Sequence, residues 1–96
     1  MTCHSDSIMQ EDTSICIVCG KPYAHRHHIL YGTANRNLSE KYGLTCGLCY
    51  NHHTGQMGVH HGNKELDMKL KRMAQERFIE VYPEQDFLAI FGRNYL

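Results

Sequence analysis

The sequence lacks an excess of charge of either sign. Ten Lys and Arg residues balance ten Asp and Glu residues, which gives the 96-residue chain a formal net charge of zero. This balance argues against a protein that coats nucleic acid through a global positive field. Any contact with a phosphate group must therefore come from a local patch or from a metal ion.

Long apolar runs are also missing. No stretch reaches the roughly 20 apolar residues needed to cross a bilayer, and the polar segment 1–14 does not have the charged-then-apolar layout of a signal peptide. We therefore expect a cytoplasmic protein with no membrane partner. Because segment 1–14 shows no periodicity either, we expect it to be a flexible N-terminal arm, and residues 15–96 to form one domain.

Cysteine occurs in an odd number, which does not suit a set of disulfides. The chain has five cysteines, and in a reducing compartment a Cys-x-x-Cys spacing indicates metal ligands before a disulfide. Cys16 and Cys19 have the form of a zinc knuckle, which supplies half of a tetrahedral site. The other half can come from Cys46 with Cys49 or from Cys49 with His52, and spacing alone leaves both registers open.

Histidine is the residue type in excess. Seven of the eight histidines lie within residues 25–61, and they include three doublets: His27-His28, His52-His53 and His60-His61. Adjacent residues of a regular strand point to opposite faces, so a doublet can place one imidazole on a metal ion and the other beside a water molecule. Hydrolysis of a phosphodiester needs this division, because it uses a Lewis acid on the phosphate and a base near neutral pKa. Histidine suits the second task, since its unperturbed pKa is about 6.5.

Loops and short strands organised by metal are expected in the first two thirds of the chain. Cys, His, Gly, Asn and Tyr are frequent between residues 16 and 61, and no helical stripe is visible there. We predict a short strand over 15–18, a β-hairpin or ribbon over 23–31, and an irregular loop over 32–43. One helical turn is expected within that loop, near residues 39–41.

Helices are expected in the last third of the chain. Apolar residues at three- and four-residue steps predict one amphipathic helix over 63–82, with a stripe of Leu66, Leu70, Met73, Ala74, Phe78 and Val81. Asn63 is the expected N-cap, and Pro83 is the expected stop signal. A second short helix over 84–91 is expected to add to the same core Phe87, Leu88 and Phe91.

The order of these motifs resembles that of the HNH endonucleases. The family pattern is a zinc knuckle, an (Asp/His)-His-Ile strand, an Asn and a Leu-Cys-x-x-Cys-His segment, and corresponding motifs follow in this order over residues 15–96. Four segments are more narrowly similar to small HNH proteins of phages and prophages of Gram-positive bacteria: HHILYGTANRNLSEKYGL, GLCYNHH, GVHHGNKELDMKLKRMAQERF and FGRNYL. The resemblance implies an α+β fold, a small zinc-stabilised ββα-metal (treble-clef-like) finger followed by C-terminal helices.

The resemblance also implies which residues bind structural zinc. In the family, the fourth zinc ligand immediately precedes a histidine that binds the catalytic ion. Leu48-Cys49-Tyr50-Asn51-His52-His53 fits this register, whereas the register that ends at Cys49 places Tyr50 where that histidine belongs. The zinc ligands implied are therefore Cys16, Cys19, Cys49 and His52.

A catalytic centre is implied in the same way. The ligands assigned to a single divalent ion, Mg²⁺, Mn²⁺ or similar, are His27, His53 and His60, with His61 as the competitor of His60. His28 takes the place of the general base. Asn35, with Asn37 in reserve, is expected to hydrogen-bond the loop backbone and fix the His28 imidazole.

The activity implied is hydrolysis of DNA phosphodiesters in a bacterial host cell. DNA is the expected partner, and a homodimer or a phage packaging or recombination partner can supply targeting that so few basic residues do not. Two other classes of function compete. One is a non-catalytic zinc module that binds nucleic acid or protein, and the other is a histidine-rich metal carrier.

Overall fold

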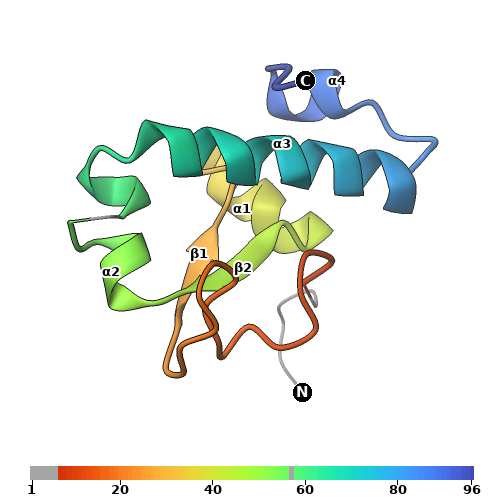
Figure 1. Cartoon of the computed structure of the whole chain (residues 1–96). Helices are drawn as coiled ribbons and strands as arrows, with labels where there is room; N and C mark the ends of the chain where they lie inside the picture. Colours follow the sequence, from red (N-terminus) through yellow and green to blue (C-terminus); the bar gives the residue numbers. More distant parts are fainter. Residues whose placement is uncertain (1–6, 57) are drawn as a thin grey trace.

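Two short antiparallel strands and the helices around them make up the computed structural model, which describes residues 7–56 and 58–96 (Figure 1). The elements in order are β1 (His25–His28), α1 (Thr33–Tyr42), β2 (Thr45–Leu48), α2 (Tyr50–His53), the 3-10 helix η1 (Val59–His61), α3 (Lys64–Val81) and α4 (Phe87–Phe91). This is the α+β class that the sequence predicts. Among the described residues, no helix combines the length and apolar character needed to cross a membrane.

The sheet differs from the one expected. Strand β1 pairs with β2, with His27 opposite Cys46 and His28 opposite Thr45, so the hairpin predicted within 23–31 is wrong. That segment has no Gly or Asn-Gly pair to form a tight turn, and the chain reverses through α1 instead. The strand predicted over 15–18 is also wrong, because the backbone there forms turns.

Helix α1 replaces the loop expected over 32–43. It runs for ten residues and ends at Gly43, whose left-handed backbone (φ 75°) suits glycine. The Ser39 side chain attaches the helix to the end of β1, because its hydroxyl donates to Leu30 O (2.6 Å) and accepts from Leu30 N (3.1 Å). Only Leu38 and Tyr42 of its apolar side chains pack against the core, which explains why no stripe was visible in the sequence.

Helix α3 crosses above α1 and the sheet in Figure 1 and supplies much of the core. Its predicted N-cap is confirmed, since Leu66 N donates to Asn63 Oδ1 (3.1 Å). Leu70, Ala74 and Phe78 are buried as predicted.

Two of the residues predicted to join the core lie outside it. Val81 is 38% exposed at the end of α3, and Leu88 is 54% exposed on α4, which begins only after the Asp86 side chain caps it. Gln75 of α3, in contrast, is buried although it is polar. Its side chain binds the C-terminal segment, because Nε2 donates to Asn94 Oδ1 and Oε1 accepts from Tyr95 N, both at 2.7 Å.

Residues 7–14, the described part of the expected arm, form no regular element but contact the domain. Ile8 N donates to Gly43 O (2.9 Å), and Arg77 Nε donates to Ile8 O (2.8 Å). The segment then passes close to β2 at Gly47, where a Cβ atom would collide with the carbonyl oxygens of Thr13 and Ile15. These contacts hold the chain that leads into Cys16 against the sheet.

Candidate metal centres

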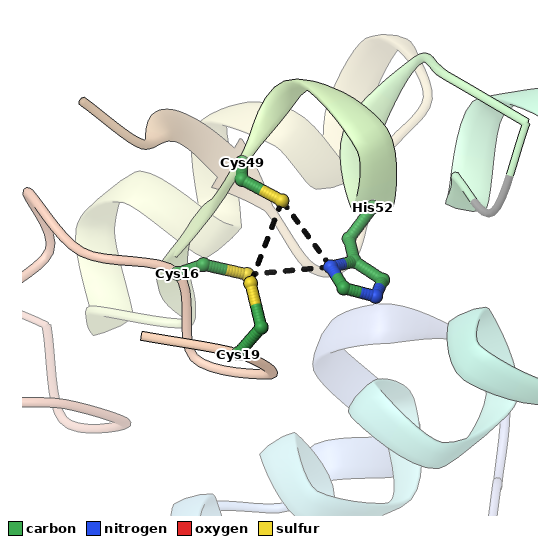
Figure 2. A group of neighbouring side chains, drawn as sticks. All are labelled: Cys16, Cys19, Cys49 and His52. Carbon is green, nitrogen blue, oxygen red and sulfur yellow. Dashed lines mark hydrogen bonds between the residues drawn. The ribbon is translucent and has the colours of Figure 1, made fainter. Parts of the chain in front are cut away.

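Three thiols and one imidazole converge beside the start of α2 (Figure 2). Cys16 and Cys19 come from a turn closed by a hydrogen bond from Gly20 N to Cys16 O (2.8 Å). Cys49 is the N-cap residue of α2, and His52 lies on that helix. The ligand atoms of these four residues all lie within 4.8 Å of one another.

The distances within this cluster fit a tetrahedral ion. Zinc bonds of about 2.3 Å to sulfur and about 2.0–2.1 Å to nitrogen put two sulfur ligands about 3.8 Å apart, and a sulfur and a nitrogen about 3.5 Å apart. Cys19 Sγ lies 3.7 Å from Cys49 Sγ, and His52 Nδ1 lies 3.2 Å from Cys49 Sγ and 3.7 Å from Cys16 Sγ. These residues are therefore positioned to hold a metal ion.

The turn also favours a thiolate at Cys16. Burial raises the pKa of Cys16, but backbone N–H groups, including those of Cys49 and Cys19, outweigh burial and lower it to about 6. The thiolate is the form that binds metal. Cys46 has no such donors in the part of the chain that the structure describes. It is fully buried on β2, outside the cluster, and burial raises the pKa of its thiol to about 12.

A second cluster consists of His27, His53 and His60. They come from β1, α2 and η1, and one ring nitrogen from each lies within 4.8 Å of the others. The glycines between α2 and η1 allow this approach, because a Cβ on Gly58 would lie 2.6 Å from the His53 carbonyl group. His60 therefore follows a helix break, as the sequence indicates. The side chain of His61 lies outside what the structure describes.

His27 is the most buried member of this cluster. Its side chain is 2% exposed, and its Nε2 atom has no hydrogen-bond partner among the described residues. Such a buried polar atom costs about 1–3 kcal/mol unless something satisfies it. Burial, together with the nearby His53 and His60, lowers the pKa of His27 to about 3, so the ring is neutral and offers a lone pair. The chemistry of this donor set fits a divalent cation.

His28, the last residue of β1, faces a carboxylate that was not expected from the sequence. Its Nε2 atom lies 3.1 Å from Oε1 of Glu40 on α1. Asn35 is half-buried on the same helix, but the structure gives no hydrogen bond between its side chain and His28, and Asn37 is exposed. Glu40 thus makes the contact with His28 that was predicted for Asn35. The sequence did not indicate this contact, because a loop was predicted where α1 forms.

A cavity of about 260 Å³ connects the histidines. Its lining residues are Arg26, His27, His28, Tyr31, Arg36, His53 and His60. Arg36 is exposed and has no ion pair within the described ranges. The cavity therefore presents imidazole and guanidinium groups to the same small volume.

His25 is a further neighbour that the sequence analysis missed. Its Nδ1 atom lies 3.1 Å from Nδ1 of His53. A signal for this contact was present, because residues two apart on a strand share a face and His25 precedes His27 by two. Hydrogen bonds of this kind orient metal-binding histidines.

Comparisons with protein-family models, with curated proteins and with solved structures gave no match to this chain. The assignment of the two clusters as metal centres therefore depends on their own geometry. One is a set of three sulfur atoms and one nitrogen atom, and the other is a set of three nitrogen atoms beside a cavity. Their different ligands suit different ions, because thiolates favour zinc and imidazole accepts several divalent metals.

Proposed function

We propose that this chain is a metal-dependent DNA endonuclease of the HNH type, which hydrolyses phosphodiester bonds with one divalent ion and His28 as general base. The observation that carries the proposal is the convergence of His27, His53 and His60 at a cavity that His28 also lines. The adjacent residues His27 and His28 of β1 thus offer one imidazole to the metal cluster and a second imidazole outside it. This is the division of labour that the reaction needs.

The arrangement of elements supports a ββα-metal fold. Strands β1 and β2 are antiparallel, and α2 follows β2 directly, so the order is strand, strand, short helix once α1 is treated as an insertion. The first strand supplies His27 and the helix supplies His53 to the same cluster. The sequence motifs that resemble the HNH family lie at these positions.

We assign the thiolate cluster to structural zinc. Cys16, Cys19, Cys49 and His52 provide four protein ligands, which complete a tetrahedron and leave no position for substrate. Such closed sites stabilise folds. Cys46 lies outside the cluster, so this assignment keeps the register that frees His53 for the other centre.

The residues around the cavity have separate tasks in the proposed reaction. His28 accepts the proton of the attacking water, and Arg36 pairs with a phosphate oxygen of the substrate. A bound Mg²⁺ or Mn²⁺ supplies Lewis-acid stabilisation of the charge that develops on the phosphate and leaving oxygen. With a net charge of zero, the chain relies on this local site for substrate contact.

Cleavage of supercoiled plasmid tests the proposal. We expect nicking or linearisation that requires Mg²⁺ or Mn²⁺, disappears in His28→Ala and His53→Ala, and remains in Glu80→Gln. Glu80 is a matched surface control, since it lies on α3 in an exposed ion pair with Arg77 (3.0 Å). Zinc content and thermal unfolding, measured on the same samples, show whether each variant is folded.

Three outcomes would overturn this function. Cleavage that persists unchanged in purified His28→Ala would remove the general base. A folded, zinc-loaded wild-type protein that binds nucleic acid or protein without cutting would favour the non-catalytic zinc module. Several exchangeable ions per chain and no turnover, counted by native mass spectrometry, would favour a metal carrier.

A further inference from the structure

We infer that Glu40 is a positioning residue that fixes the His28 imidazole with its Nδ1 atom free to accept the proton of water. The inference rests on the proposed function for its catalytic consequence, but its structural core is a hydrogen-bond chain of three side chains. Arg26 and His28 lie two residues apart on β1, and both contact Glu40 on α1.

The contacts fix both oxygens of the carboxylate. Arg26 Nη2 donates to Glu40 Oε2 (2.6 Å), and Arg26 Nε donates to Oε1 (3.3 Å). Oε1 lies 3.1 Å from His28 Nε2. The side chains of Glu40 and His28 are 21% and 14% exposed, so water competes little for this hydrogen bond.

The chemistry of the carboxylate determines which nitrogen of His28 carries the hydrogen. Burial raises the pKa of Glu40, but hydrogen bonds from Arg26 and His28 outweigh burial and lower it, so the group is ionised at neutral pH. An ionised carboxylate only accepts hydrogen bonds. His28 Nε2 must therefore donate, and in the neutral form of the ring the lone pair lies on Nδ1.

Substitution by glutamine reverses this arrangement. Arginine only donates, so the amide oxygen of Glu40→Gln is expected at the Oε2 position, where Arg26 makes its shorter bond. The NH₂ group then takes the Oε1 position, where the longer bond from Arg26 Nε (3.3 Å) is lost, and it presents a donor to His28 Nε2. That nitrogen must accept, and the ring hydrogen moves to Nδ1. The tautomer that results cannot take a proton from water at Nδ1.

A merely structural role for Glu40 predicts the opposite order of damage. If Glu40 only joined α1 to β1, glutamine would be milder than alanine, because it keeps size and hydrogen bonding. Tautomer control makes glutamine the more damaging change, since alanine imposes no donor on His28. Either variant should fold, because Ser39 still joins α1 to the end of β1 and partly exposed ion pairs are worth about 0–1 kcal/mol.

The test combines imidazole ¹⁵N NMR with steady-state cleavage of a short DNA duplex by the zinc-loaded full chain. We expect the Nε2–H tautomer of His28 in wild type and in Glu80→Gln, and the Nδ1–H tautomer in Glu40→Gln. We expect kcat to fall about 10-fold in Glu40→Ala and about 100-fold or more in Glu40→Gln, with KM within about twofold of wild type.

An unchanged His28 tautomer in Glu40→Gln, or a smaller loss of kcat there than in Glu40→Ala, would overturn the inference. A wild-type protein that does not cleave DNA would overturn the proposed function instead. The NMR result is read without turnover, so it judges the hydrogen-bond chain in either case. If Glu40→Gln fails to fold, a wild-type kcat in folded Glu40→Ala would refute the positioning role.

Discussion

Removal of zinc from the thiolate cluster should destabilise the whole domain. The cluster joins the turn of Cys16 and Cys19 to α2, segments that are more than 25 residues apart in the sequence. Without the ion, the described contacts between these ligands are weak sulfur interactions of 3.2–3.7 Å. We therefore expect the midpoint of thermal unfolding to rise strongly with free zinc.

The size of the shift in Tm follows from the free energy of zinc binding at this site. Zinc binding in small peptides releases about 10–16 kcal/mol, and the lower end applies here because Cys19 is exposed and His52 only half-buried. A value of about 10 kcal/mol corresponds to a Kd of about 50 nM. At about 10 µM free zinc, mass action then stabilises the fold by about 3 kcal/mol. For a domain of this size that is a shift of about 12–25 °C in Tm.

Scanning calorimetry on chelator-treated protein, with and without added zinc, measures this shift. Two variants identify the fourth ligand. His52→Ala should weaken binding about 100-fold and reduce the stabilisation to about 0.7 kcal/mol, or roughly 3–5 °C. Cys46→Ala should lower the starting Tm, because it removes a fully buried sulfur, and keep the full response to zinc.

Two results would refute this reasoning. A Tm that does not depend on zinc in the wild-type protein would remove the site altogether. A response lost in Cys46→Ala and kept in His52→Ala would show that the four-cysteine register is used, and that His52 is free.

Three further predictions concern the cavity, the core and acid stability. If Arg36 pairs with a substrate phosphate as proposed, Arg36→Ala should raise KM for DNA about 10- to 100-fold with little change in kcat, because a charged hydrogen bond is worth about 1.5–3 kcal/mol; a larger effect on kcat in steady-state cleavage would contradict a binding role. Phe78→Ala should reduce the free energy of unfolding by about 3–5 kcal/mol in urea titrations, because Phe78 is fully buried; a loss below about 1 kcal/mol would contradict its place in the core. The folded-state pKa of Glu40 is lowered from 4.5, so its stabilising effect should be present above pH 5 and disappear as the pH falls through the folded-state pKa; a stability difference between wild type and Glu40→Gln that grows on acidification would contradict this sign.

The residues that the structure brings together in the two clusters were named from the sequence, Cys16 and Cys19 from their spacing and the others from the resemblance. A knuckle such as Cys16-x-x-Cys19 and a helical Cys49-x-x-His52 each bring two side chains to one point, so the geometry of the cluster is largely local. His27 and His53 followed from the same motif order. Spacing left Cys46 and His52 as alternatives and the resemblance favoured His52, which is the residue that the fold brings to the cluster.

Contacts made by α1 could not be predicted in this way. The helix has few inward apolar residues, since Leu38 and Tyr42 are its packed side chains and Ser39 is its buried polar one. Because α1 has no apolar stripe, the sequence predicted neither the helix nor the contact between Glu40 and His28. Val81 and Leu88 show the converse error: Val81 follows the last buried residue of α3, and Leu88 lies on the exposed side of α4, whose buried residues are Phe87 and Phe91.

The shortness of α2 has a consequence for how the two centres assemble. Four residues cannot form a stable helix alone, yet the helix places His52 in one cluster and the adjacent His53 in the other. An ion bound by the sulfur ligands would stabilise this single turn and so orient the His53 imidazole toward the cavity. We therefore expect the cluster of Cys16, Cys19, Cys49 and His52 to bind its ion first, and zinc depletion to disturb the histidine cluster before the chain unfolds completely.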